Sequence, residues 1–124
     1  MTSPSPGQIA RYLRNQYYKT VEEYLFTLAD VMAREYRAIV AAGFVLQLDC
    51  PDLAMSYALY PGIALDDYRK IIALNVEALN QAVKDLPADR MRMPRWPKRC
   101  FAMIRIASFS DIALRLFRRI PSVS

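Results

Sequence analysis

The stretch that decides the fold covers residues 44–54 and reads FVLQLDCPDLA. Its first residues are almost all apolar, and such a run is typical of a strand that helices cover on both faces in a parallel sheet. The run stops at Asp49, and a second carboxylate, Asp52, follows after a cysteine and a proline. We therefore expect a buried strand over residues 44–49 that ends in a charged side chain.

A helical pattern precedes this strand. Thr20 and Glu23 have the spacing of a capping box, in which the threonine hydroxyl accepts a hydrogen bond from the Glu23 amide and the Glu23 carboxylate reaches back to the Thr20 amide. Apolar residues then recur at spacings of three and four as far as Gly43, and glycine often ends a helix in the left-handed conformation. The pattern predicts a helix over residues 21–42.

A second apolar stripe predicts a helix over residues 66–85, and the RMRM segment at residues 90–93 is expected to begin another strand. Strands that alternate with long helices form βαβ units with a mainly parallel sheet, so the expected fold class is α/β. Such sheets bind ligands at the carboxyl ends of their strands. Asp49 lies at that end and either pairs with an ammonium or hydroxyl group of a ligand or begins a turn. Asp52 is expected to cap the loop.

The composition is that of about one globular domain, with 124 residues of which 54% are hydrophobic and 23% charged. The net charge of +5 is concentrated in residues 94–124, termed the basic tail, which hold seven Lys or Arg against one acidic residue, whereas residues 1–93 hold ten against eleven. No stretch has the ~18 apolar residues of a membrane span, and the amino-terminal segment lacks the apolar centre of a secretory signal. We expect a cytoplasmic protein without a membrane partner.

Two cysteines, Cys50 and Cys100, lie far apart in the sequence and form no CxxC pair, so we expect reduced thiols and neither a disulfide framework nor a metal site. Cys50 is expected to be a buried small hydrophobic residue. The tyrosines of QYYKTVEEY lie near Arg14 and Lys19 and could stack on bases, but no regular alternation of basic and aromatic residues continues. We therefore expect no nucleic-acid partner.

The basic tail departs from the pattern before it, because it opens with PRWPKRC and is rich in arginine. We expect a truncated or frameshifted gene product in which this tail is read out of register and packs poorly. The alternative is an evolved tail, since SFSDIALRLFRRIPS can be drawn as a short helix with an apolar face and with Arg115, Arg118 and Arg119 as its charged residues. Such a helix could lie on an anionic membrane or a nucleic acid.

Residues 17–57 and 74–93 resemble the carboxy-terminal catalytic barrel of the cobalamin-independent methionine synthase family, which includes stand-alone and epoxyalkane coenzyme M transferase-like relatives, and the resemblance extends over about residues 5–93. Its most specific part is EYRAIVAAGF followed by LQLDCPDLA, which is similar to the family's signature of glutamine, an apolar residue, aspartate, any residue and proline. The resemblance implies that residues 1–93 are a fragment of a TIM (β/α)8 barrel of the uroporphyrinogen decarboxylase type, followed by a tail outside the family. The SPSPG segment at residues 3–7 resembles a segment that leads from a barrel strand.

The resemblance also implies a function. Members of the family are zinc-dependent methyltransferases that move a methyl group from a methyltetrahydrofolate-type donor to a thiol such as homocysteine in methionine biosynthesis. In the methionine synthases the aspartate that matches Asp49 binds the amino group of homocysteine, so the resemblance makes Asp49 the substrate-binding residue of this chain. It assigns no catalytic residue here.

The zinc site of the family has no counterpart in this sequence. The family takes its first zinc ligands from a motif of histidine, any residue and cysteine that would fall at positions 94 and 96, where this chain has Pro94 and Trp96, and the sequence contains no histidine. Cys50 and Cys100 match no ligand position. We expect no zinc in this chain alone and no methyl transfer by it.

Two alternatives to an inactive fragment remain open, a non-catalytic interaction module and one half of a split enzyme. A partial barrel leaves strand edges unpaired, and unpaired edges favour association. We therefore expect self-association or pairing with a complementing barrel fragment.

Overall fold

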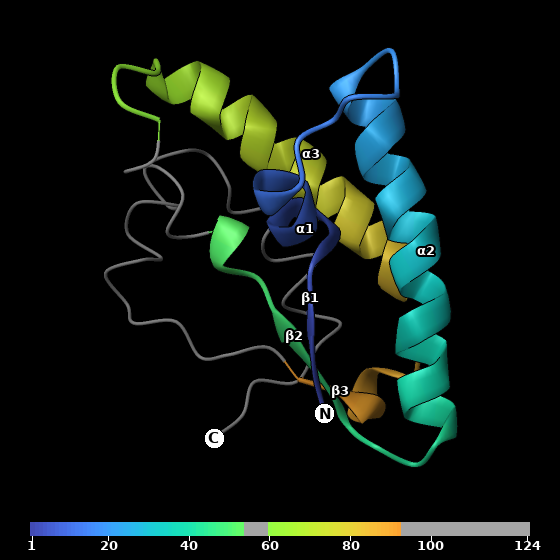
Figure 1. The fold of residues 1–124 in the computed structure, drawn as a ribbon. Helices are drawn as coiled ribbons and strands as arrows, with labels where there is room; N and C mark the ends of the chain where they lie inside the picture. The colour runs from blue at the N-terminus through green and yellow to red at the C-terminus, as the bar shows by residue number, and fades with distance from the viewer. Residues whose placement is uncertain (54–59, 93–124) are drawn as a thin grey trace.

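The computed structural model describes residues 1–53 and 60–92. The basic tail lies outside the described residues, and so do Pro94, Trp96 and Cys100. Figure 1 shows how the elements are arranged. In chain order they are β1 (Thr2–Pro4), α1 (Pro6–Tyr12), α2 (Val21–Ala41), β2 (Leu46–Asp49), the 3-10 helix η1 (Pro51–Leu53), α3 (Leu65–Val83), the 3-10 helix η3 (Ala88–Arg90) and β3 (Met91–Arg92).

The strands form one parallel sheet in the order β1-β2-β3. Thr2 pairs with Gln47 in the register of β1 and β2, and Leu46 pairs with Met91 in that of β2 and β3. Because α2 connects the first pair of strands and α3 the second, the described residues contain two βαβ units. The expected α/β class with a parallel sheet is confirmed. A closed TIM barrel needs more strands than the three described, so the barrel stays a prediction.

The helix α2 begins and ends almost as predicted. Thr20 Oγ1 accepts a hydrogen bond from the Glu23 amide at 3.0 Å, and Gly43, just after the helix, has a left-handed φ of 87°. The Glu23 carboxylate accepts from the amide of Lys19 at 3.3 Å, so the prediction that it binds the Thr20 amide is wrong by one residue. The helix α3 confirms the second predicted helix, with both ends shifted toward the amino terminus.

The strand β2 is shorter than predicted. Phe44 and Val45 lie outside it and are 54% and 39% exposed. Within β2, Leu46 and Leu48 are fully buried, whereas Gln47 and Asp49 are exposed. The prediction of a strand covered on both faces is therefore wrong, because one face packs on the helices and the other carries polar side chains.

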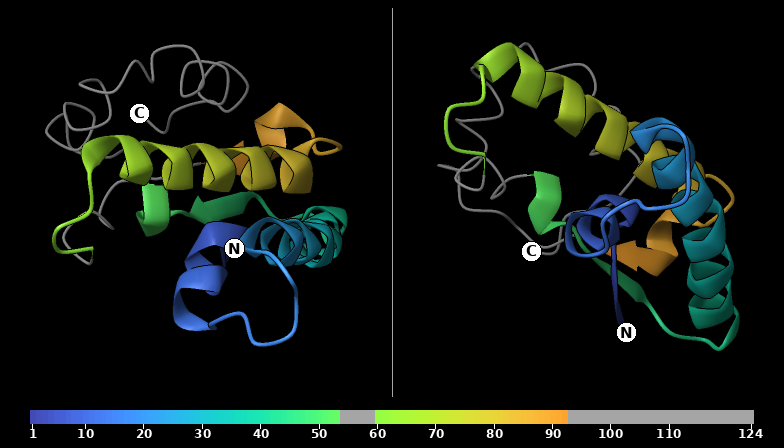
Figure 2. Two further views of the ribbon diagram at one scale, coloured as in Figure 1. Left: turned by 90° about the horizontal axis from the view of Figure 1, so that it is seen from above. Right: turned by 45° about the horizontal axis from the view of Figure 1, so that its top comes forward.

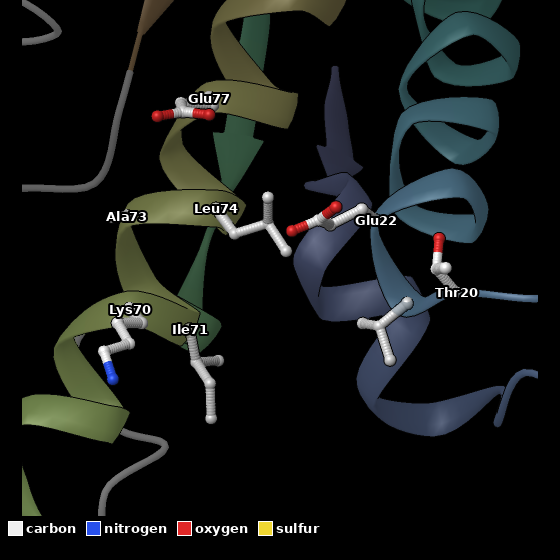
Figure 3. A pocket seen from close by; sticks show the side chains of 8 residues that line it. Thr20, Glu22, Lys70, Ile71, Ala73, Leu74 and Glu77 are labelled. Atoms are coloured by element: carbon white, nitrogen blue, oxygen red, sulfur yellow. The ribbon is translucent and has the colours of Figure 1, made fainter.

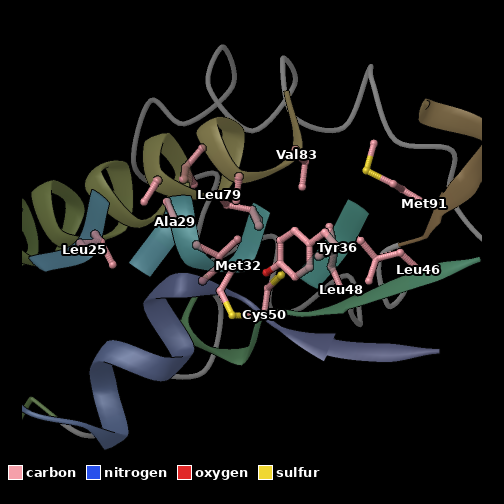
Figure 4. Packing of buried hydrophobic residues seen from close by; sticks show 14 of the residues in the cluster. Leu25, Ala29, Met32, Tyr36, Leu46, Leu48, Cys50, Leu79, Val83 and Met91 are labelled. Atoms are coloured by element: carbon pink, nitrogen blue, oxygen red, sulfur yellow. The ribbon is translucent and has the colours of Figure 1, made fainter. Parts of the chain in front are cut away.

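The hydrophobic core lies between the buried face of the sheet and the helices α2 and α3 (Figure 4). Tyr36 of α2 is fully buried there, and its hydroxyl donates a hydrogen bond to the carbonyl oxygen of Pro4. Within the described ranges, no helix combines the length and the apolar character that crossing a membrane requires. The buried hydrophobic residues of the core are Leu25, Ala29, Met32, Tyr36, Ile39, Leu46, Leu48, Cys50, Leu53, Ile72, Val76, Ala78, Leu79, Ala82, Val83 and Met91.

Figures 1 and 2 show α1 and η1 at the end of the sheet toward which β1 and β2 point. The helix α1 packs against both long helices and against η1. Ligands of α/β sheets bind at this end of the strands. The residues that follow β1 and β2 therefore form the candidate site.

Candidate functional site

The strands β1 and β2 end side by side, and this arrangement fixes the position of Asp49. Pro4 pairs with Asp49 in the parallel register, and the Ser5 amide donates a hydrogen bond to the Asp49 carbonyl oxygen at 2.9 Å. The exposed side chain of Asp49 alternates with that of Leu48, which is buried in the core. Asp49 thus lies at the carboxyl end of a parallel strand, where the sequence pattern predicts it.

Ser5 joins the strand ends to helix α1. Its hydroxyl accepts a hydrogen bond from the amide of Gln8 at 3.1 Å, which caps α1, and donates one to Asp52 Oδ1 at 2.5 Å. Asp52 is 2% exposed. It connects the segment after β2 to the start of α1, a role that goes beyond the predicted capping of its own loop.

Burial raises the pKa of Asp52 to about 6, although hydrogen bonds from Ser5 and from its own amide lower it. The charge of Arg11 and a hydrogen bond from Asn75 lower it further. Burial is also the largest cause that raises the pKa of the Cys50 thiol, followed by the charge of Asp52. Cys50 is therefore a protonated core residue, as expected, and does not have the properties of a thiolate nucleophile.

The close packing of α1 on η1 depends on Gly7. A Cβ atom at this position would lie 2.2 Å from Asp52 Oδ2 and 2.7 Å from Asn75 Cγ, which is closer than van der Waals contact. A cavity of about 110 Å³ adjoins this contact. Its lining combines the carboxyl of Asp52 and the guanidinium of Arg11 with apolar side chains, and comprises Gly7, Ala10, Arg11, Val21, Leu25, Asp52, Tyr60, Ile71 and Asn75.

A larger groove, of about 650 Å³, lies between the start of α2 and the middle of α3 (Figure 3). Ile71 and Leu74 contribute apolar side chains, whereas Glu22, Glu77 and Lys70 contribute charges. The lining side chains include no nucleophile paired with a general base. We therefore assign no reaction to this groove.

One part of the site has a sequence signal that our predictions did not use. Ser5, Pro6 and Gln8 match the pattern of a capping serine, a proline at the first helical position and a glutamine at the third, and this pattern marks the start of α1. The burial of Asp52 has no such local signal. Its partners Ser5 and Asn75 are distant in the sequence and meet it only in the folded chain.

The described residues do not fit a zinc site. The sequence contains no histidine, and among the described residues no group of three His, Cys, Asp or Glu side chains comes together. Zinc binds cysteine as the thiolate, whereas burial keeps Cys50 protonated. The positions at which the resembled family has its first ligands, 94 and 96, lie outside the described residues.

Comparison with known proteins finds distant relatives that match part of the chain. The methionine synthase of Saccharolobus islandicus (strain L.S.2.15) is 33% identical over 89 residues, which are 71% of this chain and 23% of that protein. The methionine synthase of Saccharolobus solfataricus (strain P2) is 30% identical with the same coverage. The chain thus spans less than a quarter of the length of the curated relatives it matches, and the matches support a methionine-synthase-like relationship. No protein-family model and no solved structure matches the chain.

Proposed function

We propose that the chain is part of a methionine-synthase-like methyltransferase and that Asp49 binds the ammonium group of its thiol substrate, an amino acid such as homocysteine. The observation that carries this proposal is the exposed carboxylate of Asp49 at the carboxyl end of β2, on a backbone that hydrogen bonds hold in place. The distant matches to methionine synthases support the methionine-synthase-like relationship on which the proposal rests.

The backbone and the side chain of Asp49 have different tasks in this proposal. Its carbonyl oxygen accepts from Ser5, whose hydroxyl is in turn held between the Gln8 amide and Asp52. Its carboxylate lies on the exposed face of the strand, so it can bind a ligand without disturbing the core. Hydrogen bonds between charged groups are among the stronger ones, and a strand end presents the carboxylate in a defined place.

We propose substrate binding, and no chemical step, for the described residues. Since the described residues do not fit a zinc site, we expect no methyl transfer by the isolated chain. We assign no site for the methyl donor to the described residues. A complementing barrel fragment, as in a split enzyme, would supply the zinc ligands and the donor site.

A chimera tests the proposal. The 89 matching residues of this chain replace the corresponding segment of the Saccharolobus islandicus protein, and the formation of methionine from homocysteine is measured together with the circular dichroism spectrum. We expect a folded chimera that forms methionine and an isolated chain that forms none. A folded but inactive chimera would contradict the assignment to a methyltransferase, and turnover by the isolated chain would contradict the view that it needs further parts.

A further inference from the structure

The end of α1 and the loop that follows it expose large apolar side chains beside positive charges. We term residues 11–20 the aromatic loop. In it, Tyr12, Leu13 and Tyr17 are 70%, 61% and 88% exposed. The aromatic loop contains three Lys or Arg residues and no Asp or Glu. A group of exposed apolar side chains on a protein surface often marks an interaction site.

The aromatic loop is held in a defined conformation. Asn15 Oδ1 accepts hydrogen bonds from the amides of Tyr17 and Tyr18 at 3.2 and 2.9 Å, and Asn15 Nδ2 donates to the carbonyl oxygen of Tyr18 at 2.8 Å. The hydroxyl of Tyr24 donates to the carbonyl oxygen of Leu13 at 2.7 Å. A surface that is ordered before binding loses less conformational entropy when a partner binds.

Ring contacts connect the aromatic loop to α2. Tyr18 stacks on Tyr24 with their ring centroids 5.6 Å apart, and Tyr17 meets Tyr18 edge-on at 5.2 Å. The guanidinium carbon of Arg11 lies 5.6 Å from the centre of the Tyr12 ring. Tyrosine and arginine are enriched among the residues that contribute most to binding at protein interfaces. The aromatic loop therefore has the composition of an interface centre.

The charge of the aromatic loop selects an acidic partner. Arg14 and Lys19 are exposed. The aromatic loop itself contains no carboxylate, and the next ones in the sequence are those of Glu22 and Glu23 in the first turn of α2. The Glu23 carboxylate accepts a hydrogen bond from the Lys19 amide. Complementary charge favours correct partners and accelerates association.

We propose that the aromatic loop is a docking surface for an acidic peptide segment of a partner protein that also carries aromatic or aliphatic side chains. The apolar side chains of this segment pack on Tyr17 and Leu13, and its carboxylates pair with Arg14 and Lys19. Docking at this loop does not involve Asp49 and does not depend on methyl transfer.

The test uses the full chain and a short synthetic peptide of alternating glutamate and phenylalanine, with binding measured by calorimetry and by NMR shifts of the backbone amides. A peptide with lysine in place of glutamate and a thymidine oligonucleotide are the comparison probes. We expect the acidic peptide to shift the amides of residues 11–20 and to bind more weakly at high salt, because exposed charges are screened. Tyr17→Ser and Arg14→Gln should each weaken binding about tenfold.

Matched control variants are Val31→Ser, an exposed apolar residue of α2, and Lys84→Gln, an exposed basic residue after α3. Both should bind the acidic peptide as the unmodified chain does. Equal binding of the lysine peptide, preference for the oligonucleotide, equal losses in the control variants, or no binding of the acidic peptide would each overturn the proposal. Because Tyr17 and Arg14 are exposed, thermal unfolding should change little in their variants, although Tyr17→Ser loses the ring contact with Tyr18, and this separates lost binding from lost folding.

Discussion

Ser5 Oγ and Asp52 Oδ1 lie 2.5 Å apart and join two residues that are separated by 47 positions in the sequence. The same hydroxyl caps α1 through the amide of Gln8, and the Ser5 amide binds the carbonyl oxygen of Asp49. One serine therefore connects the ends of two strands, the first helix and η1. The geometry of the candidate site therefore depends on this uncharged residue.

The Ser5→Ala variant removes the cap of α1 and takes the donor away from a buried oxygen of Asp52. Loss of a cap costs about 1 kcal/mol and loss of a donor to a buried acceptor about 1–3 kcal/mol, so the free energy of unfolding should fall by about 2–4 kcal/mol. Urea denaturation measures it. Thr20→Ala is the matched control, because it removes the exposed cap of α2 and should cost about 1 kcal/mol. Equal losses in the two variants would show that the bond to Asp52 adds nothing.

Asp52 predicts a dependence of stability on pH. Its pKa is about 6 in the folded chain, above the ordinary value of 3.8. Between these values the folded chain holds a proton that the unfolded chain has lost. The free energy of unfolding should therefore fall by about 2 kcal/mol as the pH rises from about 4 to about 6, and by about 3 kcal/mol in total from well below to well above this range. Asp52→Asn removes this titration while keeping an acceptor for Ser5.

Urea denaturation of both chains between about pH 3.5 and about pH 7 measures the difference. The stability of the unmodified chain relative to Asp52→Asn should decrease across this range. A constant difference would mean that Asp52 titrates alike in the folded and unfolded chains.

Gly7→Ala tests the contact between α1 and η1. The added methyl group meets Asp52 Oδ2 and Asn75, and Asp52 cannot move away without giving up its bond to Ser5, so we expect a loss of about 1–3 kcal/mol in the free energy of unfolding. Gly43→Ala is the control, because a Cβ there meets no atom within 4 Å and only the left-handed backbone is strained.

A double-mutant cycle tests whether the clash with Asp52 causes the loss of stability in Gly7→Ala. In an Asp52→Ala background the cost of Gly7→Ala should shrink, because the clashing oxygen is absent, whereas the cost of Gly43→Ala should not change. If both costs were unaffected by the background, the contact between Gly7 and Asp52 would not be the cause of the loss.

The ends of α2 could be predicted from the sequence because they depend on local interactions. The Thr20 hydroxyl accepts a hydrogen bond from an amide three residues away, and Gly43 has the left-handed conformation that glycine permits just after a helix. The strand was predicted less well. Phe44 and Val45 are as apolar as Leu46, yet they are exposed. The apolar run alone does not show at which residue the helices begin to cover the strand.

The candidate site shows the same division. The position of Asp49 follows from its place at the end of a strand, since parallel strands bring their carboxyl ends to one edge. The burial of Asp52 follows from its contacts with Ser5 and Asn75, which only the tertiary structure creates. The sequence pattern therefore located the exposed carboxylate and missed the buried one.

Asp49→Asn in the chimera tests the assigned role of this carboxylate. The amide cannot pair with an ammonium group as a charge, and loss of a hydrogen bond to a charged group is worth about 1.5–3 kcal/mol, so the KM for homocysteine should rise about 10- to 100-fold. The carbonyl oxygen that accepts from Ser5 is unchanged, so the fold should be retained. Asp89→Asn is the control, because Asp89 lies in η3 before β3, at the other end of the sheet, and its substitution should leave KM unchanged.

A substrate analogue separates ammonium binding from other effects of the same substitution. 4-Mercaptobutanoate is homocysteine without its amino group, and as an inhibitor of the chimera it should bind equally well with Asp49 and with the asparagine variant. If Asp49→Asn weakened the analogue as much as it weakened homocysteine, the carboxylate would act on the shape of the site and not on the ammonium group. An unchanged KM for homocysteine in a folded Asp49→Asn chimera would remove Asp49 from the substrate site altogether, and the distant matches alone would then not place the substrate at this edge of the sheet.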